Sequence, residues 1–439
     1  MITLDHCTLI TMDDDDNFYP DGRVVVSGKR ILQLGSKDSV AVQGELVDLK
    51  GALVMPGLVN AHTHSHSSIY RGLADDLELM DWLNACIWPM ESRMGTEQLA
   101  AAAKLSCLEY ICSGITTIAD HIYHPDTVAK ATAKSGMRSF LGASIFSGKG
   151  PAPGTQDTFG DAKRFVQEWQ DTSEETRIYP CMAPHAPYSL DEGLFKAVIE
   201  FAEQRDLLIH IHISETADEN RQIQEKHGLS PTVWLHSLGL FSRPVLAAHS
   251  IHLSEADMDI YAKYGVAAAY NPVSNLKLVD GIMPMQPMLQ KGITICVGTD
   301  GAQSNNSMDL LHDMRIGALL QKQWTGDATF APARQAVRIA TIEGARALRF
   351  GHETGSLEVG KRADLIALDT SSPRLCPIHR QNLSNLYSLV CYSACGADVH
   401  SVMVDGQWLM RDRKILTLDE EQVREDAQKA SEYLTAIKM

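Results

Sequence analysis

The stretch Leu58-Val59-Asn60-Ala61-His62-Thr63-His64 begins with apolar residues and ends on two histidines that are one residue apart. Side chains at positions i and i+2 of a β-strand point to the same side, so both imidazoles can face one metal ion. A single HxH pattern is commonly incidental, and its meaning depends on the rest of the chain. Three further apolar runs also end on residues that bind metals or move protons: His210-Ile211-His212-Ile213-Ser214-Glu215 after Leu207, His249 after Val245-Leu246-Ala247-Ala248, and Asp300 after residues 293–299.

Short apolar segments alternate with helical stretches from residue 57 to about residue 347. Residues 207–213 and 245–248 have the length and composition of buried strands, whereas residues 97–112 and 192–204 have the spacing of helices. Alternation of this kind predicts a (β/α)8 barrel, whose active site lies where the strands meet the following loops. We therefore expect the four segments to meet at one end of the barrel.

Strand-like segments also occupy both ends of the chain. They lie at residues 1–11, 23–28 and 47–54 before the barrel, and at 360–369, 399–405 and 407–410 after it. We predict an α/β protein in which a (β/α)8 TIM-like barrel spans residues 56–354. A small β-sandwich domain is formed by residues 1–55 together with residues 355–439. Thr417-Leu418-Asp419-Glu420 has the pattern of a capping box, and apolar residues at helical spacing up to Ile437 predict a C-terminal helix after it.

The composition limits the class of protein and of partner. The chain has 439 residues, of which 44% are hydrophobic and 21% are charged, as is typical of folded proteins. The net charge of −16 argues against nucleic acid or an anionic membrane as the main partner, and leaves a homo-oligomer open. The nine cysteines are scattered and odd in number, which is typical of reduced thiols. With no signal peptide and no apolar run of membrane-spanning length, we expect a cytoplasmic protein.

In the order HTH, HISE, AH and TD, the four segments resemble the amidohydrolase superfamily, in the branch of aromatic deaminases and chlorotriazine hydrolases. The resemblance covers essentially the whole chain, from Met55-Pro56-Gly57 to residues 360–369. It implies that one divalent ion, Zn²⁺ in most members and Fe²⁺ in some, is held by His62, His64, His212 and Asp300. It also implies that Glu215 is the proton shuttle and that His249 orients the attacking water.

These residue types suit the hydrolytic removal of an amine from a ring. A divalent ion with neutral imidazole and carboxylate ligands lowers the pKa of a bound water, and the resulting hydroxide can attack the ring carbon. The water must lose a proton and the departing amine must gain one, and a single carboxylate, Glu215, can perform both transfers. His249 and Asp300 can hydrogen-bond the attacking oxygen, which makes both catalytic candidates.

Two further features concern the metal site. Binuclear relatives need a carboxylated lysine in the middle of the barrel, and residues 178–185 contain no lysine, which favours one ion per chain. His210 lies deeper on the same strand face as His212, so we expect it to be packed and hydrogen-bonded rather than a ligand. His66 is expected to line the pocket at most.

Within this branch, the chain is most similar to deaminases of 5′-methylthioadenosine and S-adenosylhomocysteine. The likeness lies in residues 71–77 with 81–83, in 87–91, in 183–188, and in 271–278 with 301–307. It implies that Glu91 binds the ribose hydroxyls, Trp82 lines the pocket and His185 contacts the nucleoside. A carboxylate can accept two charge-assisted hydrogen bonds from a diol, and tryptophan offers an apolar wall. The alternatives are that Glu91 lies on a surface helix and that Trp82 is a core residue, and we favour the ribose-binding role.

Two departures from the family pattern bear on the substrate. Residues 139–146 lack the arginine with which some members bind the carboxylate of S-adenosylhomocysteine, and Tyr270-Asn271-Pro272 replaces a frequent His-Asn-Pro. We expect a metal-dependent hydrolytic deaminase of adenosine-type nucleosides that prefers 5′-methylthioadenosine to S-adenosylhomocysteine. Two alternatives stay open: a deaminase or dechlorinase of free purine, pterin or triazine rings, and a non-catalytic binding protein that retains the fold.

Overall fold

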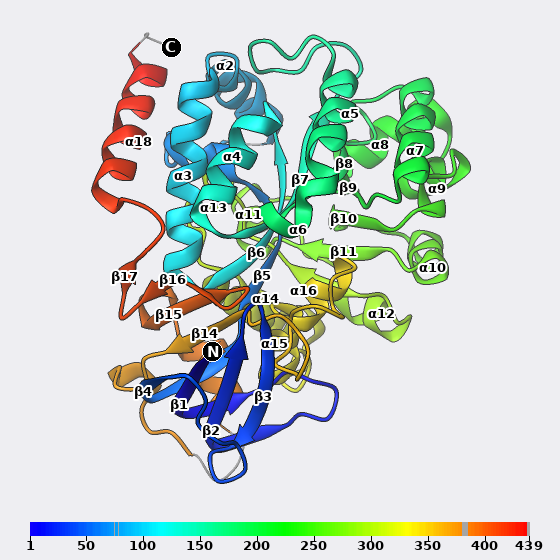
Figure 1. The fold of residues 1–439 in the computed structure, drawn as a ribbon. Helices are drawn as coiled ribbons and strands as arrows, with labels where there is room; N and C mark the ends of the chain where they lie inside the picture. The colour runs from blue at the N-terminus through cyan, green and yellow to red at the C-terminus, as the bar shows by residue number, and fades with distance from the viewer. Residues whose placement is uncertain (74, 78, 380–384, 437–439) are drawn as a thin grey trace.

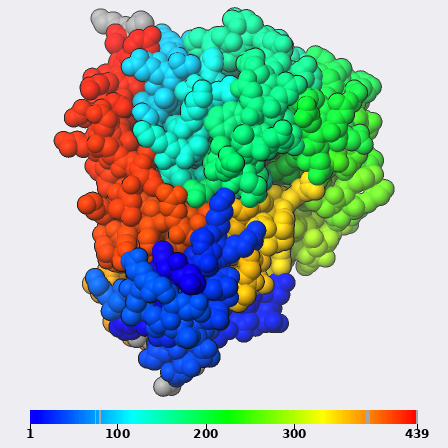
Figure 2. Space-filling view, viewed as in Figure 1, coloured from blue at the N-terminus to red at the C-terminus, as the bar shows by residue number. Residues whose placement is uncertain are grey.

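The computed structural model describes residues 1–439 except 74, 78, 380–384 and 437–439. Ala74, in one of the stretches quoted above, and Ile437, at the end of the predicted terminal helix, therefore lie outside the described residues. Figure 1 shows a barrel of strands surrounded by helices, with a second sheet beneath it. In Figure 2 the N-terminal strands (blue) and the segments that follow the barrel (orange) lie side by side in the lower part of the molecule, whereas the C-terminal helix (red) rises along one side of the barrel.

Parallel strands form the wall of the barrel, in the order β12-β11-β10-β9-β8-β7-β6-β5-β13. Their bounds are β5 Leu58–His64, β6 Ile115–Ile122, β7 Arg138–Ile145, β8 Ile178–Pro184, β9 Ile209–Ile213, β10 Val245–His249, β11 Ala267–Tyr270, β12 Ile295–Val297 and β13 Asp300–Gly301. β12 and β13 are two parts of one strand. β12 pairs with β11 and β13 pairs with β5, so the sheet closes on itself. The α/β fold class is thereby confirmed.

Gly298 allows the last strand to approach the first one. A Cβ at this position would lie 2.7 Å from the His62 carbonyl oxygen and 2.5 Å from Asn271 Oδ1, so only glycine fits. Immediately after it, Asp300 pairs with Thr63 of β5. This close approach sets Asp300 beside the two histidines of β5.

Helices follow the strands and cover the outside of the barrel (Figure 1). The main ones are α3 Thr96–Cys112, α4 Pro125–Ser135, α5 Thr158–Trp169, α7 Glu192–Arg205, α8 Ala217–His227, α9 Pro231–Ser237, α10 Glu255–Tyr264, α11 Pro272–Lys277, α12 Met285–Gln290, α14 Leu310–Thr325, α15 Ala333–Ile339 and α16 Ile342–Ala347. Several begin at a side chain that accepts a hydrogen bond from a first-turn amide, such as Asp191, Thr216 and Ser254. The helices predicted at residues 97–112 and 192–204 are confirmed.

Short helices fill the connection between β5 and α3. They are η1 Ser65–Tyr70, α1 Leu79–Trp82, the π-helical η2 Leu83–Ile87 and α2 Trp88–Glu91. Their apolar side chains, including Ile69, Trp82 and Met90, belong to one buried cluster. The connection is therefore packed against the barrel and can hold side chains at its mouth.

Both ends of the chain contribute to the second sheet, whose order is β17-β16-β15-β14-β4-β1-β2-β3. Its strands are β1 Ile2–Ile10, β2 Phe18–Ser27, β3 Arg30–Ser36, β4 Glu45–Pro56, β14 Leu365–Leu368, β15 Val399–Val404, β16 Gln407–Arg411 and β17 Lys414–Ile415. β4 lies between β1, to which it is parallel, and β14, to which it is antiparallel. The domain boundaries that we predict after residues 55 and 354 stay predictions. Strand β4 of the second sheet ends at Pro56, directly before strand β5 of the barrel.

A buried group of charges joins the barrel to this second sheet. Arg138, at the start of β7, is fully buried and donates hydrogen bonds to Asp364 and Asp405. Asp405 also accepts from Arg177 Nε at 2.9 Å and from Arg362 Nη1 at 3.2 Å. Each charge in this group has an opposite partner, which offsets the cost of burial.

The C-terminal helix α18 spans Glu420–Thr435 and packs along α3 (Figure 1). Its N-cap is Asp419, whose side chain accepts a hydrogen bond from the Gln422 amide. The predicted capping box that starts at Thr417 is therefore wrong by two residues. In the part of the chain that is described, no helix is both long and apolar enough to cross a membrane.

Candidate active site

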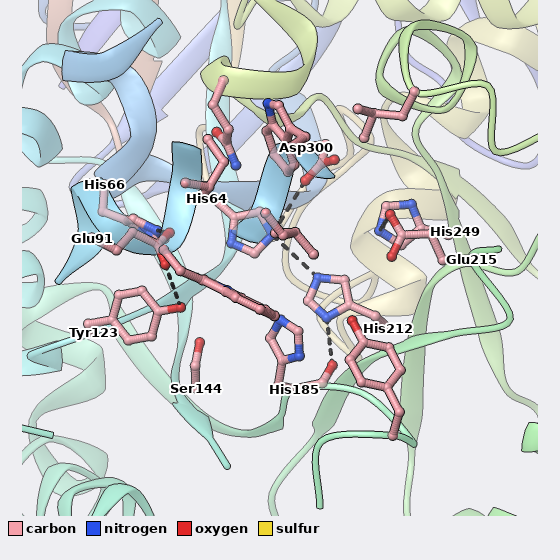
Figure 3. Close-up of a pocket in the computed structure, with 17 residues that line it drawn as sticks. His64, His66, Glu91, Tyr123, Ser144, His185, His212, Glu215, His249 and Asp300 are labelled. Carbon is pink, nitrogen blue, oxygen red and sulfur yellow. Dashed lines mark hydrogen bonds and ion pairs between the residues drawn. The ribbon is translucent and has the colours of Figure 1, made fainter. Parts of the chain in front are cut away.

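The four predicted metal ligands lie on β5, β9 and β13, and Figure 3 shows three of them, His64, His212 and Asp300, close together at the pocket. His62 Nε2 and His64 Nε2 each lie 3.4 Å from Asp300 Oδ1. His64 Nε2 lies 3.3 Å from His212 Nε2. One carboxylate oxygen and three imidazole nitrogens thus face a common point.

The other ring nitrogens of these histidines have partners that fix their orientation. His64 Nδ1 donates to the His121 carbonyl at 3.1 Å, and His212 Nδ1 donates to the His185 carbonyl at 2.6 Å. Because a carbonyl only accepts, both rings carry their hydrogen on Nδ1 and turn the Nε2 lone pair into the site. His62 Nδ1 lies 2.9 Å from His210 Nε2, so His210 is buried and hydrogen-bonded as expected.

The charge states also fit a divalent cation. Burial lowers the pKa of His64 and of His212 to about 4, so both rings are neutral at pH 7. His62 Nε2 is buried and has no hydrogen-bond partner among the described residues. Three neutral imidazoles and one carboxylate form a donor set that suits zinc.

Two serine hydroxyl groups hydrogen-bond one oxygen of the Asp300 carboxylate. Ser274 Oγ donates to Asp300 Oδ2 at 2.5 Å, and Ser304 Oγ donates to the same oxygen at 3.0 Å. Oδ1 is thereby left to face the imidazoles. The backbone of Asp300 has a φ of 58°, in the left-handed region that non-glycine residues seldom adopt.

Glu215 follows β9 in a turn that a second carboxylate stabilises. Glu219 accepts hydrogen bonds from the backbone amides of Ser214 at 2.8 Å and Glu215 at 2.9 Å. Glu215 Oε1 lies 3.5 Å from His249 Nε2. Burial, together with the nearby carboxylates of Asp280 and Asp300, raises the pKa of Glu215 well above its ordinary value. A raised pKa makes the Glu215 carboxylate a better proton acceptor, which suits general acid–base catalysis.

A pocket opens in front of this group. Its lining includes His64, His212, Glu215, His249 and Asp300, which Figure 3 labels, together with a set of apolar side chains. The apolar part of the lining is formed by Trp82, Leu83, Ile87, Trp88 and Leu278. Among the described residues that line the pocket, none is an arginine or a lysine.

Glu91 is buried at the side of this pocket and already accepts three hydrogen bonds. Oε1 accepts from His66 Nε2 at 3.1 Å and from the Tyr70 hydroxyl at 3.1 Å, and Oε2 accepts from the Tyr123 hydroxyl at 3.2 Å. The structure corrects the surface-helix alternative, because Glu91 is only 4% exposed. It lies at the end of helix α2, in which Pro89 occupies the first turn. His66 is therefore both a pocket-lining residue and a partner of Glu91.

The other two predicted substrate contacts also line the pocket. Trp82 is 5% exposed and belongs to the hydrophobic cluster of α1 and α2, so it has a core role as well. The His185 ring stacks on Phe146, with 4.6 Å between ring centroids. Both side chains can therefore contact a ring that is bound in the pocket.

Sequence reasoning missed several residues that support the site. They are Tyr70, His121, Tyr123, Ser274, Asn275 and Ser304. His121 lies one residue before the end of β6, close to a strand end as the predicted ligands are, and this was a usable signal. The others act through contacts between distant segments, which no local pattern reveals.

Comparison with known proteins gives a family match and relatives of similar length. The amidohydrolase family model matches residues 53–409. The 5-methylthioadenosine/S-adenosylhomocysteine deaminase of Pelotomaculum thermopropionicum is 40% identical over 98% of this chain and 97% of its own length. The 5′-deoxyadenosine deaminase of Methanosarcina mazei is 39% identical over 99% of this chain and 98% of its own length.

Two solved structures are similar to this chain over nearly its whole length. The crystal structure of an adenosine deaminase from Xanthomonas campestris with bound zinc has a TM-score of 0.94 and 31% identity, over 99% of both chains. A zinc complex of an atrazine chlorohydrolase from Arthrobacter aurescens, at 23% identity and a TM-score of 0.86, shares the fold. From the family match and the full-length relatives together, the chain belongs to the amidohydrolase family.

Proposed function

We propose that this protein is a metal-dependent hydrolytic deaminase of adenosine-type nucleosides, with 5′-methylthioadenosine and related 5′-deoxynucleosides as its main substrates. The observation that carries the proposal is one pocket whose lining has two chemically different parts. Glu215, whose pKa is raised, and the His/Asp group form one part, and apolar side chains together with Glu91 form the other. The relatives are named as deaminases of the same class of compound, which supports the proposal.

The metal in this proposal is one Zn²⁺ per chain, with Fe²⁺ as the alternative. His62, His64, His212 and Asp300 would hold it, because their free ligand atoms face each other and His62 Nε2 is otherwise unpaired among the described residues. When bound, the ion supplies Lewis acidity to the hydrolytic water. The bound zinc of the Xanthomonas campestris deaminase supports this choice of ion.

The protein side chains supply the proton transfers. Glu215 accepts the proton that the attacking water loses and returns it to the departing amine, because an amine leaves readily only when protonated. His249 Nε2, 3.5 Å from Glu215 Oε1, donates a hydrogen bond to the attacking oxygen. Asp300 Oδ2 stays bonded to Ser274 and Ser304, so this carboxylate keeps its orientation through the reaction.

The proposed substrate contacts come from other residues of the pocket lining. Glu91 accepts a ribose hydroxyl, while Trp82 and His185 contact the nucleoside. A 5′-methylthio group suits the apolar side chains of Leu83, Ile87 and Leu278. The zwitterionic tail of S-adenosylhomocysteine would find no lining cation, and Arg164 is already paired with Asp161 on the exposed face of α5.

A substrate panel tests the proposal directly. Zinc-loaded protein is assayed for ammonia release from adenosine, 5′-deoxyadenosine, 5′-methylthioadenosine, S-adenosylhomocysteine, guanine and a pterin, and for chloride release from a chlorotriazine. We expect turnover of the adenosine compounds, with 5′-methylthioadenosine among the best. Turnover confined to free bases or triazines would contradict the nucleoside assignment. Binding without turnover of any compound would favour the non-catalytic alternative.

A further inference from the structure

Two asparagine amides hold the His249 ring on the side that faces away from Glu215. Asn275 Nδ2 lies 3.0 Å from His249 Nδ1, and Asn271 Nδ2 lies 3.3 Å from the same nitrogen. Both asparagines and His249 are almost completely buried. A neutral imidazole carries one hydrogen, on either Nδ1 or Nε2, and the hydrogen-bond partners of the ring decide which nitrogen carries it.

A second contact decides the orientation of the Asn275 amide. Asn275 Nδ2 also donates to Asp280 Oδ2 at 3.2 Å, and the backbone carbonyl of Asn275 accepts from the backbone N–H of Asp280 at 2.9 Å. Above the raised pKa of Asp280, about 7, its carboxylate is ionised, and a reversed Asn275 side-chain amide would set its oxygen against a carboxylate oxygen with no hydrogen between them. The two N–H groups of Asn275 therefore point at Asp280 and at His249 Nδ1.

We propose that Asn275 and Asp280 are positioning residues that fix His249 as the tautomer with its hydrogen on Nε2. A nitrogen that accepts a hydrogen bond cannot carry a hydrogen in the same direction, so Nδ1 is bare and Nε2–H points towards Glu215. This inference rests on the proposed function for its catalytic meaning, because a donor at Nε2 is what the attacking oxygen requires.

The same contacts give His249 a different role from the proposed metal ligands. His249 lies close enough to His62 and His212 that these three ligand atoms form a group within 4.8 Å. An imidazole nitrogen that carries a hydrogen has no lone pair for a metal. His64 and His212 donate from Nδ1 to carbonyls, whereas His249 accepts at Nδ1 from an amide. Opposite partners at Nδ1 thus distinguish two of the proposed ligands, His64 and His212, from His249.

Exchanging the side chains of residues 275 and 280 tests whether these two residues set the tautomer of His249. In the double variant Asn275→Asp with Asp280→Asn, the charge, the volume and the mutual hydrogen bond are retained. A carboxylate now faces His249 Nδ1 and can only accept, so the ring should change to the Nδ1–H tautomer. Asn271 can follow this change, since its Oδ1 has no partner within the described part of the chain and its amide can turn.

The tautomer is read from zinc-loaded protein labelled with ¹⁵N in the histidine rings. A long-range ¹H–¹⁵N spectrum distinguishes a nitrogen that carries hydrogen from one that does not, and the signals absent in His249→Gln belong to His249. Burial raises the pKa of Asp280 to about 7, so spectra are recorded at about pH 8.5, where the carboxylate is ionised. We expect Nε2–H in the natural protein and Nδ1–H in the exchanged variant.

Kinetics on 5′-methylthioadenosine complete the test. In the exchanged variant kcat should fall about 10²-fold, as when one oriented donor is lost, with KM changed less than about threefold and zinc retained. Asn275→Ala is the second variant, and should give a mixture of tautomers with an intermediate kcat. The matched control is Asn220→Ala, which removes an amide that donates to the His252 carbonyl at 2.7 Å in the neighbouring loop. It should leave both tautomer and kcat close to those of the natural protein.

Several results would overturn the inference. One is an Nδ1–H ring in the natural protein, and another is an exchanged variant that keeps full kcat. If the exchanged variant does not fold, unchanged Nε2–H in Asn275→Ala would have the same meaning. If the natural protein has no deaminase activity, the proposed function fails, but the spectra still decide the tautomer.

Discussion

Glu91 provides the sharpest test of the nucleoside assignment, because its carboxylate is almost fully engaged before any substrate binds. Oε1 accepts from His66 and Tyr70, and Oε2 accepts from Tyr123. Each carboxylate oxygen accepts about two hydrogen bonds, so one position, on Oε2, remains for a ribose hydroxyl. One charge-assisted hydrogen bond contributes about 1.5–3 kcal/mol, which corresponds to about 10- to 150-fold in kcat/KM.

The perturbation is Glu91→Gln, which keeps the shape of the side chain. Its amide oxygen can serve His66 and Tyr70, and the Tyr123 hydroxyl can turn to accept from its NH2 group. The assay compares adenosine with 2′,3′-dideoxyadenosine, which has no diol. We expect the loss in kcat/KM for adenosine only, with unchanged zinc content.

The control for this experiment is Tyr70→Phe, which removes one donor from Glu91 at a residue that is not part of the pocket lining. It should affect both nucleosides alike and only weakly. An equal loss on both substrates in Glu91→Gln would refute the reasoning and make Glu91 a structural residue.

Four further outcomes are expected. Glu215→Gln should lower kcat by at least about 10²-fold with zinc retained, since the shuttle is lost while the ligands remain, and near-normal turnover would mean that another group moves the proton. Metal analysis should give about one zinc per chain, and removal by a chelator should abolish activity until zinc is restored; two ions per chain, both required, would contradict the single site. 5′-Methylthioadenosine should exceed S-adenosylhomocysteine about 10- to 100-fold in kcat/KM, because no described cation lines the pocket, and equal efficiencies would argue against this. Asp405→Asn should destabilise the protein by about 3–5 kcal/mol by leaving Arg138 poorly paired, whereas Asp206→Asn at an exposed pair should cost less than about 1 kcal/mol; similar melting temperatures would show that the buried charges contribute little.

The barrel and its metal-binding group could be predicted because both have local signals. Each barrel strand is a short apolar run, and the proposed ligands stand at the ends of such runs. His62 and His64 need only the two-residue repeat of a strand to face the same way. The position of His210 also follows from this repeat, since it places His210 one step deeper than His212.

The remaining features depend on contacts that no local pattern contains. Thr417 and Asp419 are both good N-caps, and only the packing of α18 selects Asp419. Pro89 suggests an interruption, yet it is tolerated because it lies in the first turn of α2, where no backbone donor is needed. The three donors to Glu91 come from η1 and from the residue after β6, so they meet only once the barrel has formed.

The position of β4 between β1 and β14 has a consequence for synthesis of the chain. Val54 in β4 pairs with Ala367 in β14, so the ribosome must make the whole barrel before this strand finds its second neighbour. Until then β4 presents an apolar strand edge, which is a site for pairing with other chains. Chains that terminate within the barrel would keep that edge permanently. We therefore expect this strand edge to be covered only when the last quarter of the sequence has been made, although the candidate catalytic residues all precede that part.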